Sequence, residues 1–202
     1  MLAMIEIEKK FLLDVESKAR LIDGAEFLGS KTVIDVLYDA ADYRITCSDS
    51  ILRERNGRFE LKVSVHDNHN AKTRLVDQYR ELETETEIRG HMEISKSGTL
   101  KEDLKRHGVV PCFTLTTIRE RYRNGEFAID IDSVDFGFDV VEIELMVEDK
   151  AHMQEALEKI IAFAASRGLT KTPHGGKYME YIRRHRLEHY AALVRSGVAG
   201  EP

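Results

Sequence analysis

Hydrophobic and acidic side chains alternate along residues 127–147, whose sequence is FAIDIDSVDFGFDVVEIELMV. Successive side chains of a strand point to opposite sides of a sheet, so each half of this stretch predicts a strand with one apolar and one acidic face. Residues 133–137 supply the turn between the halves, which makes a β-hairpin the expected structure. The acidic face then carries Asp130, Asp132, Glu142 and Glu144.

Carboxylates gathered on one sheet face repel one another unless cations neutralise them. Hard oxygen ligands at this density suit Mg²⁺, Mn²⁺ or Ca²⁺. A solvated sheet face explains the same alternation without any ligand, because Asp and Glu are common on such faces. The pattern by itself therefore leaves both interpretations open.

The same alternation of charged and apolar positions recurs in segments before this hairpin. Further strands are predicted over residues 4–13, 32–38, 51–65, 77–83 and 112–123. The segment 51–65 is expected to be a hairpin that turns at Asn56-Gly57, a strong hairpin signal. The bases that share a face within their own segments include Arg53 with Arg55, and Arg119 with Arg121.

Helices are predicted over residues 14–24, 84–107, 150–168 and 177–195, and polar loops over residues 39–49 and 66–74. Asp14 is placed to cap the first helix. The second is expected in two pieces, broken at Ser97-Gly98. Thr99 and Glu102, which follow the break, have the spacing of a capping box. Apolar residues recur at helical spacing in the third helix and predict a core-facing stripe.

The composition is that of a globular chain, with 202 residues, of which 42% are hydrophobic and 33% charged. The net charge of −6 argues against a general nucleic-acid binder. Cys47 and Cys112 form no C-x-x-C pair, which fits a reduced intracellular protein. The charged start MLAMIEIEKK is unlike a signal peptide, and no segment approaches a membrane span. We expect one domain over residues 1–202, cytoplasmic and monomeric, with neither a nucleic-acid nor a membrane partner.

At least six of the predicted strands place charges on one face, acids in some strands and bases in others. A closed barrel with that face inward would bury the charges, which is costly unless they bind a ligand and a metal. Lys and Arg would hold a polyanion, and carboxylates would hold the metal that bridges to it. A magnesium-bound triphosphate meets this description.

Taken in chain order, the charged motifs resemble those of the CYTH superfamily, the triphosphate tunnel metalloenzymes. The run EIEKK at residues 6–10 matches the ExExK signature, and LRER, ELK, YREL, IRER, IDID and VEIE follow in the family's order. The likeness extends from about Met4 to Arg195 and is greatest to the thiamine triphosphatases of animals. It implies an α+β fold, in which a closed antiparallel β-barrel of about eight strands forms a tunnel and helices pack outside.

The resemblance also implies the residues of a site. Triphosphate would be bound by Lys10, Arg53, Arg55, Lys62, Arg119, Arg121 and Lys177, with Tyr79 as a candidate ring contact. One or two divalent ions, Mg²⁺ or Mn²⁺, would be held by Glu6, Glu8, Glu81, Asp130, Asp132, Glu142 and Glu144. The catalytic residues would be Lys62, Glu8 and Glu144, the two glutamates through the metal that orients and acidifies the attacking water. Lys62 is the candidate for assisting proton transfer, and phosphate binding alone is an equally open role for it.

These inferences give the hypothesis of a metal-dependent triphosphatase that acts on thiamine triphosphate or a similar organic triphosphate. Two departures from the animal-type pattern concern recognition of the ring. Leu37 stands where the family usually has a tyrosine, and Ile51 stands where an aromatic residue helps hold the thiamine. An inorganic triphosphatase is therefore the main alternative, followed by a class IV adenylyl cyclase and by a polyphosphate-binding module without hydrolytic activity.

A competing motif lies near the end of the sequence. Residues 185–189, HRLEH, match the H-x-x-E-H pattern of zinc peptidases, in which both histidines lie one helical turn apart. A zinc protease is disfavoured because no helix with a further acidic ligand follows, and so short a match arises by chance.

Overall fold

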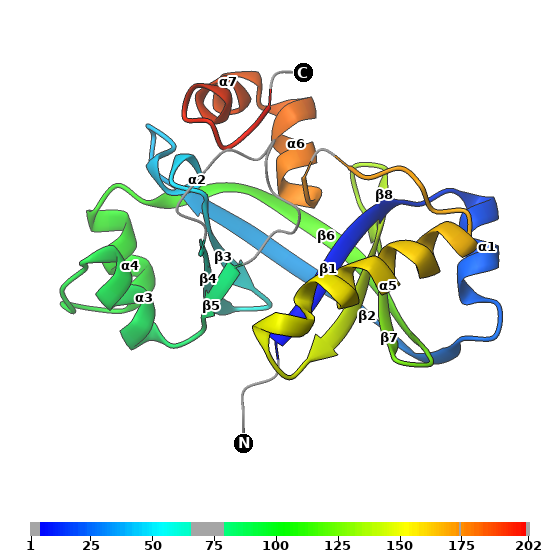
Figure 1. The fold of residues 1–202 in the computed structure, drawn as a ribbon. Coiled ribbons are helices and arrows are strands. Elements are labelled where there is room, and N and C mark those ends of the chain that lie inside the picture. Colours follow the sequence, from blue (N-terminus) through cyan, green and yellow to red (C-terminus); the bar gives the residue numbers. More distant parts are fainter. Residues whose placement is uncertain (1–4, 66–78, 174, 201–202) are drawn as a thin grey trace. The chain divides into compact units, whose positions relative to one another are not determined.

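A computed structural model describes residues 5–65, 79–173 and 175–200 of the chain (Figure 1). It divides into two compact units, of which unit 1 comprises residues 1–32 and 117–181 and unit 2 comprises residues 33–116 and 182–202. Strands β2 (Glu26–Asp39) and β6 (Val110–Asn124) contribute residues to both units. The single domain expected over residues 1–202 stays a prediction.

Eight strands form one antiparallel sheet in the order β1-β8-β7-β6-β2-β3-β4-β5. Besides β2 and β6, these are β1 (Ile5–Leu12), β3 (Ser50–Arg55), β4 (Arg58–Ser64), β5 (Tyr79–Leu82), β7 (Phe127–Val134) and β8 (Phe138–Val147). The α+β class and the eight antiparallel strands expected from the sequence are confirmed. Closure of the sheet into a barrel stays a prediction.

The apolar face of the unit 1 sheet packs against helix α5 (Met153–Ser166), which contacts β1 and β8 (Figure 1). Ile143 of β8 lies between Lys9 of β1 and Ile129 of β7 in the register. Both isoleucines are fully buried, as is Ile160 of α5. The alternation seen in the sequence thus separates an apolar face from a charged face, as predicted.

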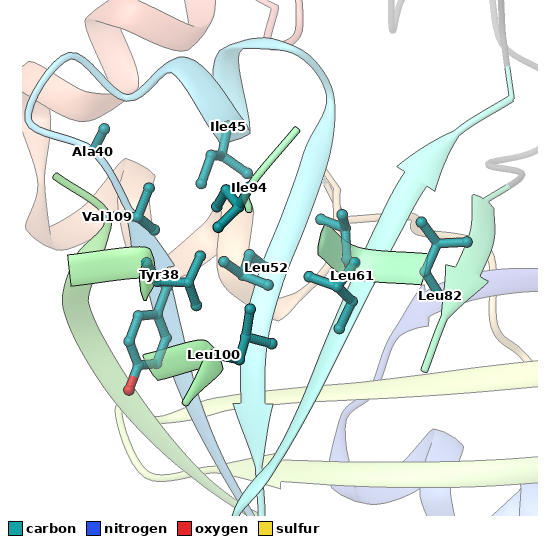
Figure 2. Packing of buried hydrophobic residues seen from close by; sticks show 11 residues of the cluster. Tyr38, Ala40, Ile45, Leu52, Leu61, Leu82, Ile94, Leu100 and Val109 are labelled. Carbon is teal, nitrogen blue, oxygen red and sulfur yellow. The ribbon is translucent and has the colours of Figure 1, made fainter. Parts of the chain in front are cut away.

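Unit 2 buries the apolar face of its strands in the same way. A cross-strand row runs from Tyr38 through Leu52 and Leu61 to Leu82, and all four side chains are at most 1% exposed (Figure 2). Helices α3 (Glu85–Met92) and α4 (Leu100–Arg106) add buried side chains to this hydrophobic cluster. These side chains are Ile88, Leu100 and Leu104.

The helix caps follow the local sequence closely. α1 (Val15–Ile22) begins after Asp14, whose carboxylate accepts a hydrogen bond from the Ser17 amide at 2.7 Å. α4 begins after Thr99, which forms the predicted capping box with Glu102. Such a box satisfies amide groups that the first helical turn leaves without partners.

Two elements between β1 and β3 differ from the sequence prediction. Strand β2 begins at Glu26 instead of residue 32, because β6 is its neighbour in the sheet and offers a long strand to pair with. The polar loop expected at residues 39–49 contains a short helix, α2 (Arg44–Cys47). Its turn is stabilised by Asp39, whose carboxylate accepts hydrogen bonds from the backbone amides of residues 40, 45 and 46. A local side-chain cap of this kind has no periodic signal.

The single last helix predicted over residues 177–195 is two helices, α6 (Lys177–His185) and α7 (Leu187–Arg195). Arg186 between them has non-helical backbone angles, with φ −138° and ψ 68°. The break lets α7 pack on α2, a tertiary contact that the sequence pattern does not encode. A 3₁₀ turn, η2 (Lys150–His152), precedes α5.

Some predicted features lie outside the described residues. These are Met4, the polar loop at residues 66–74 and the first two residues of the strand at 77–83. Among the helices of the described part of the chain, every one is too short or too polar to cross a bilayer.

The buried row of unit 2 predicts a large cost for removing one of its members. Leu61→Ala is expected to lower the free energy of unfolding by about 2–5 kcal/mol, because the cavity cannot be refilled by its packed neighbours. Ile34→Ala is the control, since Ile34 is 45% exposed and should cost less than about 1 kcal/mol. Urea denaturation followed by circular dichroism measures both, and equal losses would contradict the assigned core.

Candidate functional site

The charged face of the unit 1 sheet is assembled by strand register. Glu8 of β1 faces Glu144 of β8, and Lys10 faces Glu142 two residues further along. The row continues across the sheet, because Glu142 also pairs with Asp130 of β7 and Asp130 with Arg121 of β6. Arg119 pairs with Asp132 in the next row. The residues whose common face was predicted from alternation are therefore brought together.

Arg119 is a highly connected cation of this face. Its Nη1 donates to Asp130 Oδ2 at 2.7 Å, and its Nη2 donates to Glu142 Oε2 at 2.7 Å. Its Nε and Nη2 also donate to the two oxygens of Asp132, at 2.6 and 2.8 Å. One guanidinium thus bridges three carboxylates, two on β7 and one on β8, with the two-pronged geometry that favours Arg over Lys.

Three other predicted cations lie on the same face. Lys10 forms ion pairs with Glu8 and, at 3.5 Å, with Glu142. Lys177, at the start of α6, is buried, and its Nζ lies 3.1 Å from Thr117 Oγ1 and 3.3 Å from Asp132 Oδ2. Arg121 is 52% exposed and reaches Asp130 at 3.3 Å.

Two groups of carboxylates are close enough to share a metal ion. Glu6, Glu8 and Glu144 form one group, and Asp130, Glu142 and Glu144 form the other. In each group one oxygen per residue lies within 4.8 Å of the others. A donor set made only of carboxylate oxygens fits a hard divalent cation such as Mg²⁺ or Mn²⁺. Among the described residues, neither group includes Asp132 or Glu81, which were predicted ligands.

The pKa values of this face reflect its crowding. Burial, together with the carboxylates of Glu6, Asp130 and Glu142, raises the pKa of Glu144 to about 7, although Arg119 opposes the shift. The pKa of Arg119 is raised despite its burial, because hydrogen bonds to Asp132 and the nearby charges of Glu142 and Asp130 favour the cation. Glu144 belongs to both carboxylate groups and is therefore the point at which repulsion concentrates.

Unit 2 carries a second charged face, opposite to its apolar row. Arg53 contacts Glu60 Oε2 through Nε at 2.8 Å and through Nη2 at 2.6 Å. Arg55 holds the fully buried Asp35 through two hydrogen bonds of 2.7 and 3.1 Å. Each predicted cation is therefore fixed by an acid on a neighbouring strand, so its direction is set by the sheet.

The remaining predicted residues of unit 2 lie at the β4–β5 pair. Lys62 Nζ lies 2.5 Å from Glu81 Oε1. Burial alone would raise the pKa of Glu81, but the charge and hydrogen bond of Lys62 outweigh it, and the pKa is lowered. The Tyr79 hydroxyl donates to Asp49 Oδ1 at 3.2 Å.

The two positions that depart from the animal-type pattern lie on this charged face. Leu37 pairs with Arg53 in the register, and Ile51 pairs with Lys62. Tyr38 instead belongs to the apolar row, where its hydroxyl donates to Glu54 at 2.7 Å. As predicted, Tyr38 cannot replace a hydroxyl at the position of Leu37, because adjacent strand residues face opposite ways.

Two acids of unit 2 were not recognised as site residues from the sequence. Asp35 and Glu60 are the partners that hold Arg55 and Arg53. A signal for Asp35 exists, since it is an isolated acid within the apolar strand sequence TVIDVLYD. Buried acids of this kind are nearly always paired.

The HRLEH motif does not form a zinc site. His185 is exposed at the end of α6, whereas His189 is fully buried in α7. The helix break at Arg186 separates them, so they are not one turn apart on one helix. His189 Nε2 instead lies 2.7 Å from Thr46 Oγ1, and its ring stacks on Tyr43 with 4.0 Å between ring centroids.

Comparison with known proteins agrees with this arrangement. The sequence profile of the CYTH domain matches residues 4–172. The thiamine-triphosphatases of Homo sapiens and Macaca fascicularis are each 25% identical over 213 residues, which cover 95% of this chain and 90% of theirs.

Solved structures share the fold. The PH1819 protein from Pyrococcus horikoshii OT3 aligns with a TM-score of 0.64 and 22% identity, over 90% of this chain and 100% of its own. HpAC1 from Hippeastrum, named as an adenylyl cyclase and described as having a dominant triphosphatase activity, aligns with a TM-score of 0.57 and 17% identity, over 90% and 96% of the two chains.

The raised pKa of Glu144 predicts a pH-dependent effect of removing its charge. In the native state Glu144 holds its proton up to about pH 7, whereas its ordinary value is 4.5, so its ionisation destabilises the fold as pH rises through this interval. In EDTA, Glu144→Gln is expected to raise the free energy of unfolding more at pH 8 than at pH 5, by about 1–3 kcal/mol. Urea denaturation at the two pH values measures the difference, with exposed Glu126→Gln as the control. An equal effect at both pH values would contradict the assigned repulsion.

Proposed function

The chain belongs to the CYTH domain family, and on this premise we propose that it is a metal-dependent hydrolase that releases the terminal phosphate of a small triphosphate. The observation that carries the proposal is the charged face of unit 1, where carboxylates that could hold a metal interleave with cations that could hold phosphate. A binder of polyphosphate alone would need the bases and would gain nothing from two carboxylate groups. Metal-dependent hydrolysis needs the bases for phosphate binding and the carboxylates for metal binding.

The acids are proposed to hold one or two divalent ions, Mg²⁺ or Mn²⁺. Glu6 and Glu8 would do so in one group and Asp130 and Glu142 in the other, with Glu144 shared between them. When bound, such an ion supplies an oriented and more acidic water and neutralises charge on the phosphate. Glu8 and Glu144 are therefore proposed as catalytic residues that act through the metal they would hold.

The bases are proposed to bind phosphate oxygens and orient the terminal phosphate. In unit 1 these are Lys10, Arg119, Arg121 and Lys177. In unit 2 the proposed phosphate ligands are Arg53, Arg55 and Lys62. Lys62 is also the residue proposed to assist proton transfer, and its ion pair with Glu81 fixes the position of its ammonium group.

Thiamine triphosphate is the leading proposed substrate. The support is the likeness to the two thiamine-triphosphatases along 95% of this chain, and Tyr79 is the proposed ring contact. Inorganic triphosphate is the second candidate, favoured by the aliphatic side chains of Leu37 and Ile51 on the charged face of unit 2. An aliphatic side chain offers no stacking surface for a thiamine ring. As expected from the sequence, we propose a cytoplasmic monomer that acts on a small molecule.

The deciding experiment is phosphate release with Mg²⁺ from thiamine triphosphate, inorganic triphosphate and ATP, with EDTA as the control. Preference for thiamine triphosphate supports the leading substrate, and preference for inorganic triphosphate supports the second. Cyclic AMP formed from ATP, in place of released phosphate, would identify a cyclase. Binding without any product would identify a module that does not hydrolyse.

Glu144→Ala tests the metal in the same assay. Because Glu144 belongs to both carboxylate groups, its loss is expected to lower Mg²⁺-dependent turnover at least about 100-fold while the circular dichroism spectrum stays unchanged. Glu126→Ala, in the turn before β7, is the matched control and should keep wild-type turnover. Full activity of the Glu144 variant would show that the metal assignment is wrong.

Arg55→Ala tests the phosphate ligands of unit 2. Loss of a charge-assisted hydrogen bond costs about 1.5–3 kcal/mol, so KM for the preferred triphosphate should rise at least about tenfold. Arg58→Ala removes an exposed arginine that is paired with Arg55 in the register, and it should leave KM within about twofold. An unchanged KM in a folded Arg55 variant would remove Arg55 from the site.

A further inference from the structure

Arg119 contacts acids of two different kinds. Asp130 and Glu142 belong to a carboxylate group that could share a metal ion, and each gives Arg119 one oxygen at 2.7 Å. Asp132 belongs to neither group, is fully buried, and binds Arg119 through both of its oxygens. The same guanidinium is therefore bound on one side by candidate metal ligands and on the other by an acid that is not grouped with them.

A divalent cation and Arg119 compete for Asp130 and Glu142. Mg²⁺ binds carboxylate oxygens at about 2.0–2.1 Å, so a metal held by these two residues would lie close to the terminal nitrogens of Arg119. Like charges at that separation repel strongly in a partly buried site. The side chain of Arg119 is only 15% exposed, which limits screening by water. A metal held by the two acids would therefore weaken the contacts that Arg119 makes with them.

Among the described residues, Asp132 is in neither carboxylate group, and it also holds a second cation. Its Oδ2 lies 3.3 Å from Lys177 Nζ, and Thr117 fixes the same ammonium through its hydroxyl at 3.1 Å. A paired contact such as that between Asp132 and Arg119 fixes the guanidinium plane, which a single contact does not. Asp132 thus contacts two of the proposed phosphate ligands, Arg119 and Lys177.

We infer that Asp132 is a positioning residue for Arg119 and Lys177 and does not ligate metal. If Asp130 and Glu142 hold a divalent cation, Arg119 would release them, stay attached to Asp132 through Nε and Nη2, and present Nη1 and the second hydrogen of Nη2 to phosphate oxygens. The inference rests on the proposed function, since it takes the metal and the triphosphate from there. It adds an order of binding, because Arg119 becomes available for phosphate only after Asp130 and Glu142 have bound the metal.

Calorimetry with Mg²⁺ alone distinguishes the roles of Asp130 and Asp132, the two acids of β7. Asp132→Asn is expected to keep the Kd for Mg²⁺ within about threefold of wild type and to weaken triphosphate binding at least about tenfold, measured as KM. Asp130→Asn is the matched variant, two residues away on the same strand face, and should weaken Mg²⁺ binding at least about tenfold. Arg123→Gln, an exposed arginine of β6, controls for a general change in charge. Equal losses of Mg²⁺ binding in the two Asp variants would overturn the inference.

A second measurement needs no change at Asp132 and so does not depend on that variant folding. The arginine Nε–H signal of Arg119, assigned by its loss in Arg119→Lys, is followed by nuclear magnetic resonance while Mg²⁺ is added without any triphosphate. The signal should shift in wild type and stay unmoved in Glu144→Ala. An unmoved wild-type signal, while calorimetry shows Mg²⁺ binding, would overturn the inference, as would a wild type that binds neither Mg²⁺ nor Mn²⁺.

The failures of the inference and of the proposed function are distinguishable. Hydrolysis of a triphosphate with an unmoved Arg119 signal would reject the exchange and keep the enzyme. An Mg²⁺-dependent shift without hydrolysis of any triphosphate would keep the exchange and reject the enzyme.

Discussion

Charge balance on one face of the unit 1 sheet is the constraint on which the site depends. Three carboxylates from two adjacent strands lie within hydrogen-bond distance of a single guanidinium, that of Arg119. An uncompensated charge at this depth costs several kcal/mol, so the cation is needed for the fold as well as for the proposed chemistry. Glu144 shows the limit of this compensation. Its raised pKa means that the face is still short of positive charge, which is what a metal would supply.

In each unit, the strands have one apolar face that packs on helices and one charged face. In unit 1 the face opposite the charges packs on α5, and in unit 2 it packs on α3 and α4. Rigid packing on one side sets the directions of side chains on the other, because adjacent residues of a strand share one backbone. The positions of Leu61 and Lys62 illustrate the link, since burial of the first orients the second toward Glu81.

Alternation in the sequence was sufficient to predict which residues share a face, and turn and capping signals located the hairpins and most helices. Alternation could not predict pairing across strands. Whether Asp130 or Asp132 is grouped with Glu144 depends on register and depth, and both acids have the same local pattern. The roles of Asp35 and Glu60 were missed for the same reason. The helix break at Arg186 was missed because it serves a tertiary contact, and no Gly or Pro marks it.

The contact between α7 and α2 has a consequence for the behaviour of the chain in acid. Thr46 donates its only hydroxyl hydrogen to Asp39, so the hydrogen between Thr46 and His189 must come from the imidazole Nε2, which fixes the neutral tautomer. Burial lowers the pKa of His189 to about 4. In the unfolded chain His189 therefore binds a proton near pH 6.5, whereas in the folded chain it stays neutral down to about pH 4. The free energy of unfolding consequently falls as the pH drops from 6.5 toward 4. Helix α7 is thus attached to α2 through the uncharged ring of His189, and protonation of this ring in acid weakens the attachment.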